Sequence, residues 1–150
     1  MSRDITFYIV DIFIAIDKLK RYSKPYVTSD ELHYSELAWD ACIRELEVVG
    51  EATKQLLENK LIDSSYRRVV DFRNQISHGY FGINEDIVWD VIQNKIPQYE
   101  NDLLDMVKIQ EFNLKDTIQA FYKDNLSNES IEYLQYLEGI VWKIEFLPKS

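Results

Sequence analysis

The chain has 150 residues, of which 46% are hydrophobic and 29% are charged, a balance typical of one globular domain with a sizeable core. Its four glycines and three prolines supply too few turns for a β-sandwich or a β-barrel, so the composition favours an all-α fold. The formal net charge of −9 argues against a general polyanion-binding surface, because nonspecific affinity for nucleic acid comes mainly from Lys and Arg contacts to phosphate. Any RNA binding is therefore expected to be local.

The single cysteine and the N-terminal segment indicate the compartment. Cys42 has no second cysteine to pair with, which excludes an internal disulfide and a cysteine-based zinc site and favours a reducing environment. The apolar run at residues 5–16 is interrupted by Asp11 and closed by Asp17, unlike a signal peptide or a membrane span. We expect a cytoplasmic protein without membrane association.

Apolar residues at three- and four-residue spacing predict the first two helices. The first covers residues 5–22 and ends at Ser23-Lys24-Pro25. The second is longer, begins at Ser29 or Asp30, either of which can cap it, and continues towards Leu61. The apolar positions expected along this second helix are Leu37, Trp39, Cys42, Ile43, Leu46, Val49, Leu56 and Leu57.

Capping residues delimit the next two helices. The third helix is expected to start at Asp63 or Ser64 and to end at Gly79, which supplies a left-handed C-cap. Asn84 caps the fourth helix, and Pro97 should kink it because proline removes an internal hydrogen bond. The apolar positions expected in the fourth helix are Ile87, Val88, Val91, Ile92, Tyr99, Leu103 and Met106.

Four amphipathic helices with short connections predict an up-down four-helix bundle at residues 1–110. Gly50 and Ala52 would allow a second helix to approach closely. Residues 111–150 read differently, with two shorter helical patterns at 114–122 and 130–146. We interpret them as a second unit, a C-terminal helical hairpin packed on the bundle.

Several candidate ligands have simple structural explanations. His33 is expected to be a surface histidine, and Cys42 lies on an apolar stripe and is expected in the core. Glu47 and Glu51 are four residues apart, as in di-iron bundles, but the Glu-x-x-His motifs of such sites are absent. We expect both to be exposed acids, with Arg44 as an ion-pair partner. No metal site is predicted.

The strongest candidate site lies at the end of the third helix, at residues 73–80. Cleaving RNA without a metal requires a group that exchanges protons near neutral pH and a permanent cation that holds the phosphate, demands that His78 and Arg73 meet. Asn74 and Ser77 add donors and acceptors nearby. By itself, an Arg-x4-His spacing is better explained by a histidine that complements the helix dipole beside a glycine cap.

The surrounding residues add specificity. The segment Arg73-Asn-x-x-x-His78-x-Tyr80-Phe81-Gly82, followed by Ile87-Val88-Trp89 and Ile96-Pro97, resembles the HepT-like branch of the HEPN superfamily. These proteins are ribonuclease toxins paired with minimal nucleotidyltransferase antitoxins. The upstream segment from Arg44 to Ala52 and the start at Arg3-Asp4 are also similar to that family. The resemblance covers roughly residues 3–108 and does not extend to residues 111–150.

The resemblance implies a fold, a reaction and a mode of control. The fold would be a HEPN four-helix bundle that dimerises, so that Arg73 and His78 of both subunits line one cleft. Arg67 and Arg68 are further candidates for its positive charge. The implied activity is a metal-independent endoribonuclease without a cofactor, the toxin of a type VII-like toxin–antitoxin pair. Asn74 and Ser77 would support the reaction, and Tyr80 would receive AMP from the cognate nucleotidyltransferase.

Two other functions fit the same sequence. One is a non-catalytic helical subunit that binds a nucleotidyltransferase and helps hold its substrate. The other is a helical interaction protein that uses its C-terminal hairpin alone. The presence of Arg73, Asn74, His78 and Tyr80 together favours the enzyme, because a scaffold could lose them.

Overall fold

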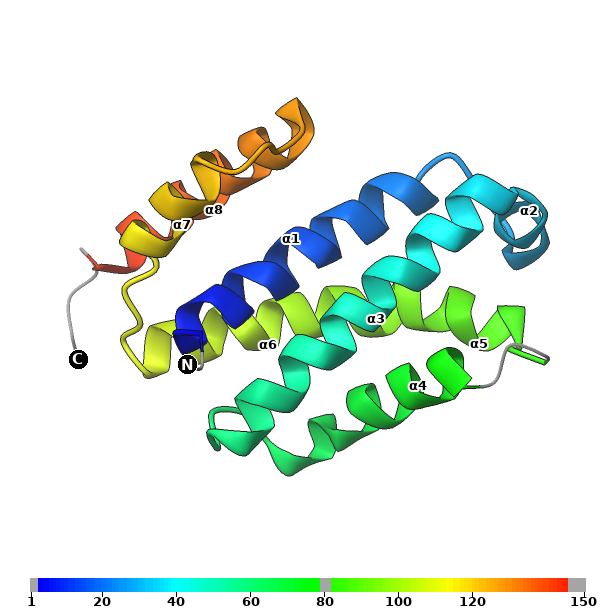
Figure 1. Cartoon of the computed structure of the whole chain (residues 1–150), viewed down its shortest axis with the longest axis horizontal. Coiled ribbons are helices and arrows are strands. Elements are labelled where there is room, and N and C mark those ends of the chain that lie inside the picture. The colour runs from blue at the N-terminus through cyan, green and yellow to red at the C-terminus, as the bar shows by residue number, and fades with distance from the viewer. Residues whose placement is uncertain (1–2, 79–81, 146–150) are drawn as a thin grey trace.

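The structure is a computed structural model that describes residues 3–78 and 82–145, with side chains through residue 141. In this part of the chain the regular elements are all helical, as predicted, and no strand occurs (Figure 1). The helices are α1 (Ile5–Ser23), α2 (Ser29–Tyr34), α3 (Glu36–Glu58), the short η1 (Ser64–Tyr66), α4 (Arg67–His78), α5 (Glu85–Asp90), the π-turn η2 (Val91–Lys95), α6 (Ile96–Ile109), α7 (Lys115–Tyr122) and α8 (Asn128–Glu145).

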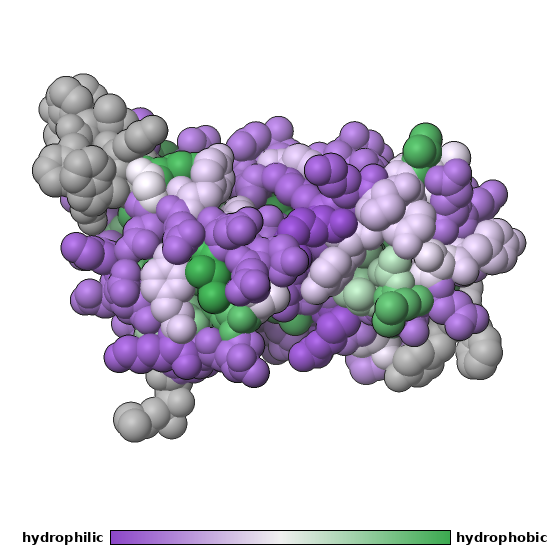
Figure 2. All heavy atoms as spheres, turned by 90° about the horizontal axis from the view of Figure 1, so that it is seen from above, coloured by the Kyte–Doolittle hydropathy of each residue, from purple (hydrophilic) through white to green (hydrophobic). Residues whose placement is uncertain are grey.

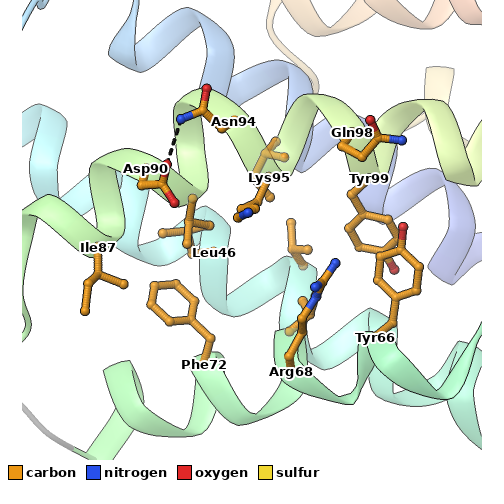
Figure 3. Close-up of a pocket in the computed structure, with 14 residues that line it drawn as sticks. Leu46, Tyr66, Arg68, Phe72, Ile87, Asp90, Asn94, Lys95, Gln98 and Tyr99 are labelled. Carbon is orange, nitrogen blue, oxygen red and sulfur yellow. Dashed lines mark hydrogen bonds between the residues drawn. The ribbon is translucent and has the colours of Figure 1, made fainter.

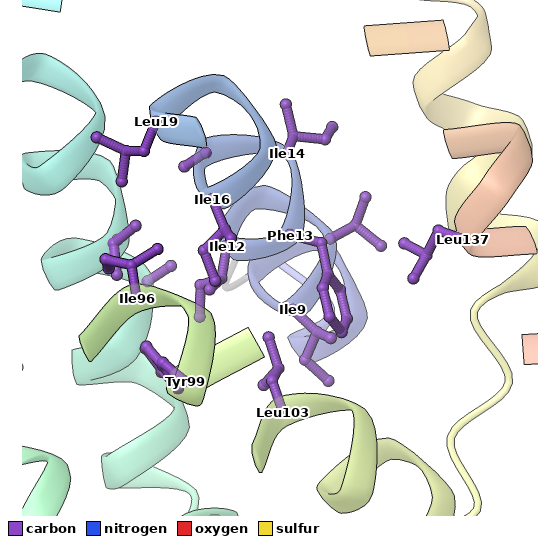
Figure 4. Packing of buried hydrophobic residues seen from close by; sticks show 14 of the residues in the cluster. Ile9, Ile12, Phe13, Ile14, Ile16, Leu19, Ile96, Tyr99, Leu103 and Leu137 are labelled. Carbon is purple, nitrogen blue, oxygen red and sulfur yellow. The ribbon is translucent and has the colours of Figure 1, made fainter. Parts of the chain in front are cut away.

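Helix α1 is the centre of the molecule. It lies between α3 and α6 on one side and the α7–α8 hairpin on the other (Figure 1). Its buried side chains include Ile9, Ile12 and Phe13, and Val10, Ile14 and Ala15 are buried as well. A helix that is apolar nearly all round is stable only when it is covered all round. The fully buried side chains around it include Ile9, Ile12, Phe13, Ile16, Leu19, Leu103 and Leu137 (Figure 4).

The predicted second helix is divided in two, which corrects the sequence interpretation. Ser35 has a non-helical backbone (φ −89°, ψ 82°), and its carbonyl accepts the first bond of α3 from the Trp39 amide at 2.8 Å. Its hydroxyl also lies 2.8 Å from the Tyr26 hydroxyl, so a partly buried polar contact favours the break. The cap of α2 is Thr28, not Ser29 or Asp30.

Burial corrects two of the apolar positions that we expected. Leu37, which the break places in the first turn of α3, is 87% exposed. Ile87 in α5 is 53% exposed, because α5 is short and its outer side borders solvent. The remaining expected positions of α3 and of the fourth helix are buried or pack against the core.

The predicted fourth helix begins as expected at Asn84, whose side chain accepts hydrogen bonds from the amides of Asp86 and Ile87. The interruption expected at Pro97 takes the form of the widened turn η2 directly before it. Proline cannot donate the amide hydrogen that a regular α-helix needs at that point, and a π-turn accommodates the defect. Helix α6 then continues to Ile109.

The C-terminal residues form the expected helical hairpin, and polar contacts join it to the bundle. The Thr6 and Thr117 hydroxyls are 2.6 Å apart, and the Tyr133 hydroxyl donates a hydrogen bond of 3.1 Å to Glu100, which also pairs with Lys20. Leu137 enters the same apolar cluster as α1 (Figure 4). The division into domains at residue 110 stays a prediction.

The face of the molecule seen in Figure 2 is mainly hydrophilic, and its apolar side chains form small separate patches. This agrees with a chain that carries 26 acidic and 17 basic side chains. Among the residues that the structure describes, we find no helix with the length and apolar character required to cross a bilayer.

Candidate functional site

Helix α4 carries the predicted site and presents most of its side chains to solvent. Asp63 starts the preceding turn by accepting a hydrogen bond of 2.8 Å from the Ser65 amide. Only Val70 and Ile76 of α4 are fully buried, and the helix packs mainly against α3. Its twelve residues include three arginines and one aspartate. This helix therefore supplies a local positive charge to an acidic chain, which agrees with the expectation that any RNA binding is local.

Arg73 lies directly against Gly50 of α3. A Cβ atom added at Gly50 would be 2.2 Å from Cβ and 2.5 Å from Cγ of Arg73, closer than side chains can approach. The glycine therefore lets the two helices meet at this point, as the sequence suggested for Gly50.

Polar contacts hold the guanidinium group of Arg73. Its Nη2 pairs with the Glu51 carboxylate, and its Nη1 donates a hydrogen bond of 2.9 Å to Oδ1 of Asn74. Nε is buried and has no hydrogen-bond partner within the described residues. The side chain is 28% exposed, so the fork of N–H donors is fixed in place and still accessible to a phosphate. Glu51 is exposed as predicted, but its ion pair links two helices.

His78 ends α4 and lines a pocket of about 470 Å³ on the side towards α5. Its neighbours in the lining include Ile83, Asn84 and Ile87. Arg73, by contrast, has its contacts on the side towards α3. The structure thus brings Arg73 together with Asn74 and places His78 around the helix from Arg73. Ser77 is half-buried. Tyr80 and the predicted cap Gly79 lie outside the described residues.

A larger groove of about 540 Å³ separates α4 from the α5–η2–α6 segment (Figure 3). Leu46 lies at its apolar wall, Phe72 at one end, and Tyr66 and Tyr99 at the other end with their rings stacked at 4.6 Å. Tyr66 donates a hydrogen bond to Asp102, and burial, followed by this bond, raises its pKa. No local sequence pattern predicts this groove, because its walls come from α3, from η1 and α4, and from the α5–η2–α6 segment.

His33, which we expected to be a surface histidine, is half-buried and contacts two other residues. Its Nδ1 lies 2.5 Å from Oε2 of Glu85, an ion-pair contact without the alignment of a hydrogen bond, and its ring meets Trp39 edge-on at 4.9 Å. A hydrogen bond with Asp30 is the main cause that raises the pKa of Glu85. This cluster joins α2 to the start of α5. Sequence spacing could not find it, since His33 and Glu85 are far apart in the chain.

Neither a metal centre nor a reactive thiol is evident in the described part of the chain. No three His, Cys, Asp or Glu side chains there are grouped so that they could hold a metal ion. Cys42 is buried as predicted, and burial, aided by Glu45, raises the pKa of its thiol to about 12. A thiol that stays protonated at neutral pH is a poor nucleophile, so Cys42 is a core residue.

Comparison with known proteins gives a consistent family. The sequence model described as "Ribonuclease HepT-like" matches residues 12–106. "Putative RNase MJ0127" of Methanocaldococcus jannaschii is 31% identical over 110 residues, which cover 71% of this chain and 90% of that protein. "Probable ribonuclease HepT" of Thermococcus cleftensis is 27% identical over 65% of this chain and 90% of its own length.

One relative also covers the C-terminal hairpin. "Gamma-glutamylcyclotransferase and putative RNase MJ0434" of Methanocaldococcus jannaschii is 25% identical over 97% of this chain and 69% of its own length. No solved structure matches this chain.

Proposed function

Since the chain belongs to the HepT-like ribonuclease family, we propose that it is a metal-independent endoribonuclease and the toxin of a type VII-like toxin–antitoxin pair acting in the cytoplasm. The observation that carries the proposal is the placement of Arg73 and His78 on α4, the helix where positive charge gathers. Arg73 is anchored by Gly50 and Glu51, and His78 lines a pocket of its own.

The proposed reaction is an internal transfer at phosphorus. The ribose 2′-oxygen attacks the adjacent phosphorus, and a neutral His78 imidazole takes the 2′-hydroxyl proton. The bond from phosphorus to the 5′-oxygen breaks, and this oxygen receives a proton from a second imidazole in its protonated form. The products are a 2′,3′-cyclic phosphate and a 5′-hydroxyl. Arg73 donates hydrogen bonds to the phosphate oxygens as negative charge develops there, and Asn74 orients its guanidinium.

The second imidazole is the reason that we propose a homodimer. One chain has only one histidine in the motif, and its Arg73 has its contacts towards α3 while His78 lines the pocket towards α5. A second copy with its α4 facing the first would add another histidine and another arginine to one cleft. Two sets of α4 arginines would also concentrate the positive charge that an acidic chain needs for RNA.

We propose further that a minimal nucleotidyltransferase controls the enzyme by attaching AMP to Tyr80. This part rests on the sequence, in which Tyr80 follows His78 by two residues in the motif. An added phosphate near Arg73 would compete with the substrate for the same cation.

Cleavage of a labelled cellular RNA by purified wild type, Arg73→Ala and His78→Ala tests the function. We expect cleavage with cyclic phosphate ends by wild type, in EDTA as well as in buffer, and loss in both variants with an unchanged circular-dichroism spectrum. Arg73→Lys should also be weak, because an ammonium cannot hold phosphate through a planar fork. Full activity of His78→Ala, or loss in EDTA that a divalent metal restores, would refute the mechanism.

The same experiment addresses the non-catalytic alternative. A subunit that only helps a nucleotidyltransferase would cleave no RNA in any form but would bind that enzyme. Light scattering of the wild type should give twice the mass of 17.9 kDa. If the protein cleaved RNA as a strict monomer, the proposal of a site shared by two subunits would be refuted.

A further inference from the structure

We propose that the groove between α4 and the α5–η2–α6 segment binds one unpaired nucleotide of the RNA, with a preference for a base that carries an amino group. This inference rests on the proposed ribonuclease function and adds a specificity site to it. The groove, of about 540 Å³, is large enough for a base and its sugar, and nothing in the described chain fills it.

The walls of the groove suit the faces of a base. Phe72 at one end offers an aromatic ring beside the apolar side chains of Leu46 and Ile87 (Figure 3). Tyr66 and Tyr99, stacked on each other, close the opposite end. Bases stack on such rings and displace water from apolar surface, which gives affinity without regard to sequence.

Two cations stand across the groove from each other. Arg68 comes from α4 and Lys95 from the last position of η2, and the nitrogens of both are directed into the space between the helices (Figure 3). Both residues are exposed at the rim. Cations in this position can hold the phosphate of a nucleotide whose base lies between the walls. The π-turn matters here, because it adds a residue to the turn and such turns often occur at functional sites.

The polar rim favours particular bases. Asn94 donates its amide hydrogen to Asp90 at 2.7 Å, and Gln98 donates to Asp102 at 2.9 Å. Each amide keeps a second N–H group free, so neither one selects a base, whereas Asp90, which lines the groove, offers carboxylate oxygens that only accept hydrogen bonds. This carboxylate matches the amino groups of adenine and cytosine, whereas the O4 carbonyl oxygen of uracil would meet it unfavourably.

The position of the groove connects it to the proposed chemistry. Phe72 and Ile87 line both this groove and the pocket that contains His78. The two cavities are therefore neighbours along α4 that share these walls. An RNA strand with its scissile phosphate at His78 can place an adjacent nucleotide in the groove, so base preference near the cut would be decided here.

Binding of RNA hexamers to the full-length His78→Ala protein, followed by calorimetry, separates binding from cleavage. We expect the adenosine hexamer to bind about tenfold more tightly than the uridine hexamer, the size of effect that one base contact gives. Asn94→Trp, which fills the groove from an exposed position, should abolish the preference, and Lys95→Glu should weaken both hexamers. The matched controls are Gln93→Trp on the same turn and Lys108→Glu on α6, both exposed and outside the groove.

Each contrary result has a distinct meaning. Equal binding of the adenosine hexamer by Asn94→Trp and Gln93→Trp, or a preference for uridine, would overturn the inference. AMP alone binding as tightly as the hexamer would mean a free-nucleotide site, and loss of the dimer in Asn94→Trp would mean that a second copy covers the groove; both outcomes overturn it. If wild type cleaved no RNA while Asn94 still governed hexamer binding, the proposed function would fail and the nucleotide groove would stand.

Discussion

The Arg73 side chain fills the space that a Cβ atom at Gly50 would need, with 2.2 Å between that position and Cβ of Arg73. A motif residue on α4 and a glycine on α3 thus form a single contact. The next residue of α3, Glu51, pairs with the same arginine. Gly50 and Glu51 of α3 therefore position the arginine of the Arg-x4-His motif on α4.

Gly50→Ala should separate α3 from α4 and move Arg73. We expect it to lower the free energy of unfolding by about 1–3 kcal/mol, the usual cost of forcing extra atoms into a packed site, and to abolish RNA cleavage. Gly139→Ala is the matched control, because nothing lies within 4 Å of a Cβ there. It should stabilise α8 by roughly 0.5–1 kcal/mol. Urea unfolding measures the free energy of unfolding of both variants. If Gly50→Ala were as stable as Gly139→Ala, the contact between Gly50 and Arg73 would tolerate an added methyl group.

Glu51→Ala should reduce cleavage although Glu51 itself touches no substrate in the proposed reaction. Without the carboxylate, the guanidinium of Arg73 is held only by Asn74 and loses its orientation, so kcat should fall by about 10- to 100-fold. Glu51→Gln, which keeps an acceptor, should retain part of the activity. Glu47→Ala, one turn earlier on α3, is the control. Faster cleavage by Glu51→Ala would mean that the carboxylate competes with the phosphate.

Glu45→Gln should alter how stability depends on pH. Burial raises the pKa of Glu45 above its ordinary 4.5, against the attraction of Lys18, whose Nζ is 3.8 Å from the carboxylate. The folded state then binds the proton more tightly, so the free energy of unfolding falls as pH rises from about 4.5 through the raised pKa. Glu45→Gln should lack this fall, so its free energy of unfolding relative to that of the wild type should increase between pH 4 and pH 8. Urea unfolding at pH 4 and pH 8 measures this difference. Glu58→Gln is the control for the loss of one negative charge, because Glu58 is exposed. The same slope in both variants would contradict burial as the cause.

Leu137→Ala should destabilise the whole protein although the residue lies in the C-terminal hairpin. Leu137 is buried against α1, and the lost contacts and the cavity should cost about 2–5 kcal/mol. Tyr136→Ala is the control, because Tyr136 is 64% exposed and its loss should change stability by roughly 0.5 kcal/mol or less. A single urea transition that shifts only in Leu137→Ala is expected. Separate transitions for the bundle and the hairpin would contradict a shared core.

Tyr80→Phe should escape silencing by the cognate nucleotidyltransferase. After incubation with that enzyme and ATP, wild type should gain the mass of AMP and lose cleavage, whereas Tyr80→Phe should do neither, because it lacks the phenolic oxygen. Intact mass spectrometry and the cleavage assay measure the two effects. Equal neutralisation of both proteins would show that the antitoxin acts by docking alone.

The sequence by itself predicted most of the helical segments and the candidate site. Spacing of apolar residues gives the face of a helix, and residues such as Asn84 and Asp63 mark its start, because both signals arise within a few residues of chain. The family resemblance likewise rests on short motifs around Arg73 and His78. The break at Ser35 escaped prediction because a contact with Tyr26 accompanies it, outside the helix pattern.

Only the tertiary structure decided which side of each helix meets which neighbour. The pairing of Arg73 with Glu51 and of His33 with Glu85 joins residues that no local spacing relates. The groove beside α4 exists because α4 packs on α3 and leaves space towards η2, a result of how whole helices pack. Periodicity fixes the angle of a side chain about its own helix axis, but the partner at that angle depends on long-range packing, which local sequence does not encode.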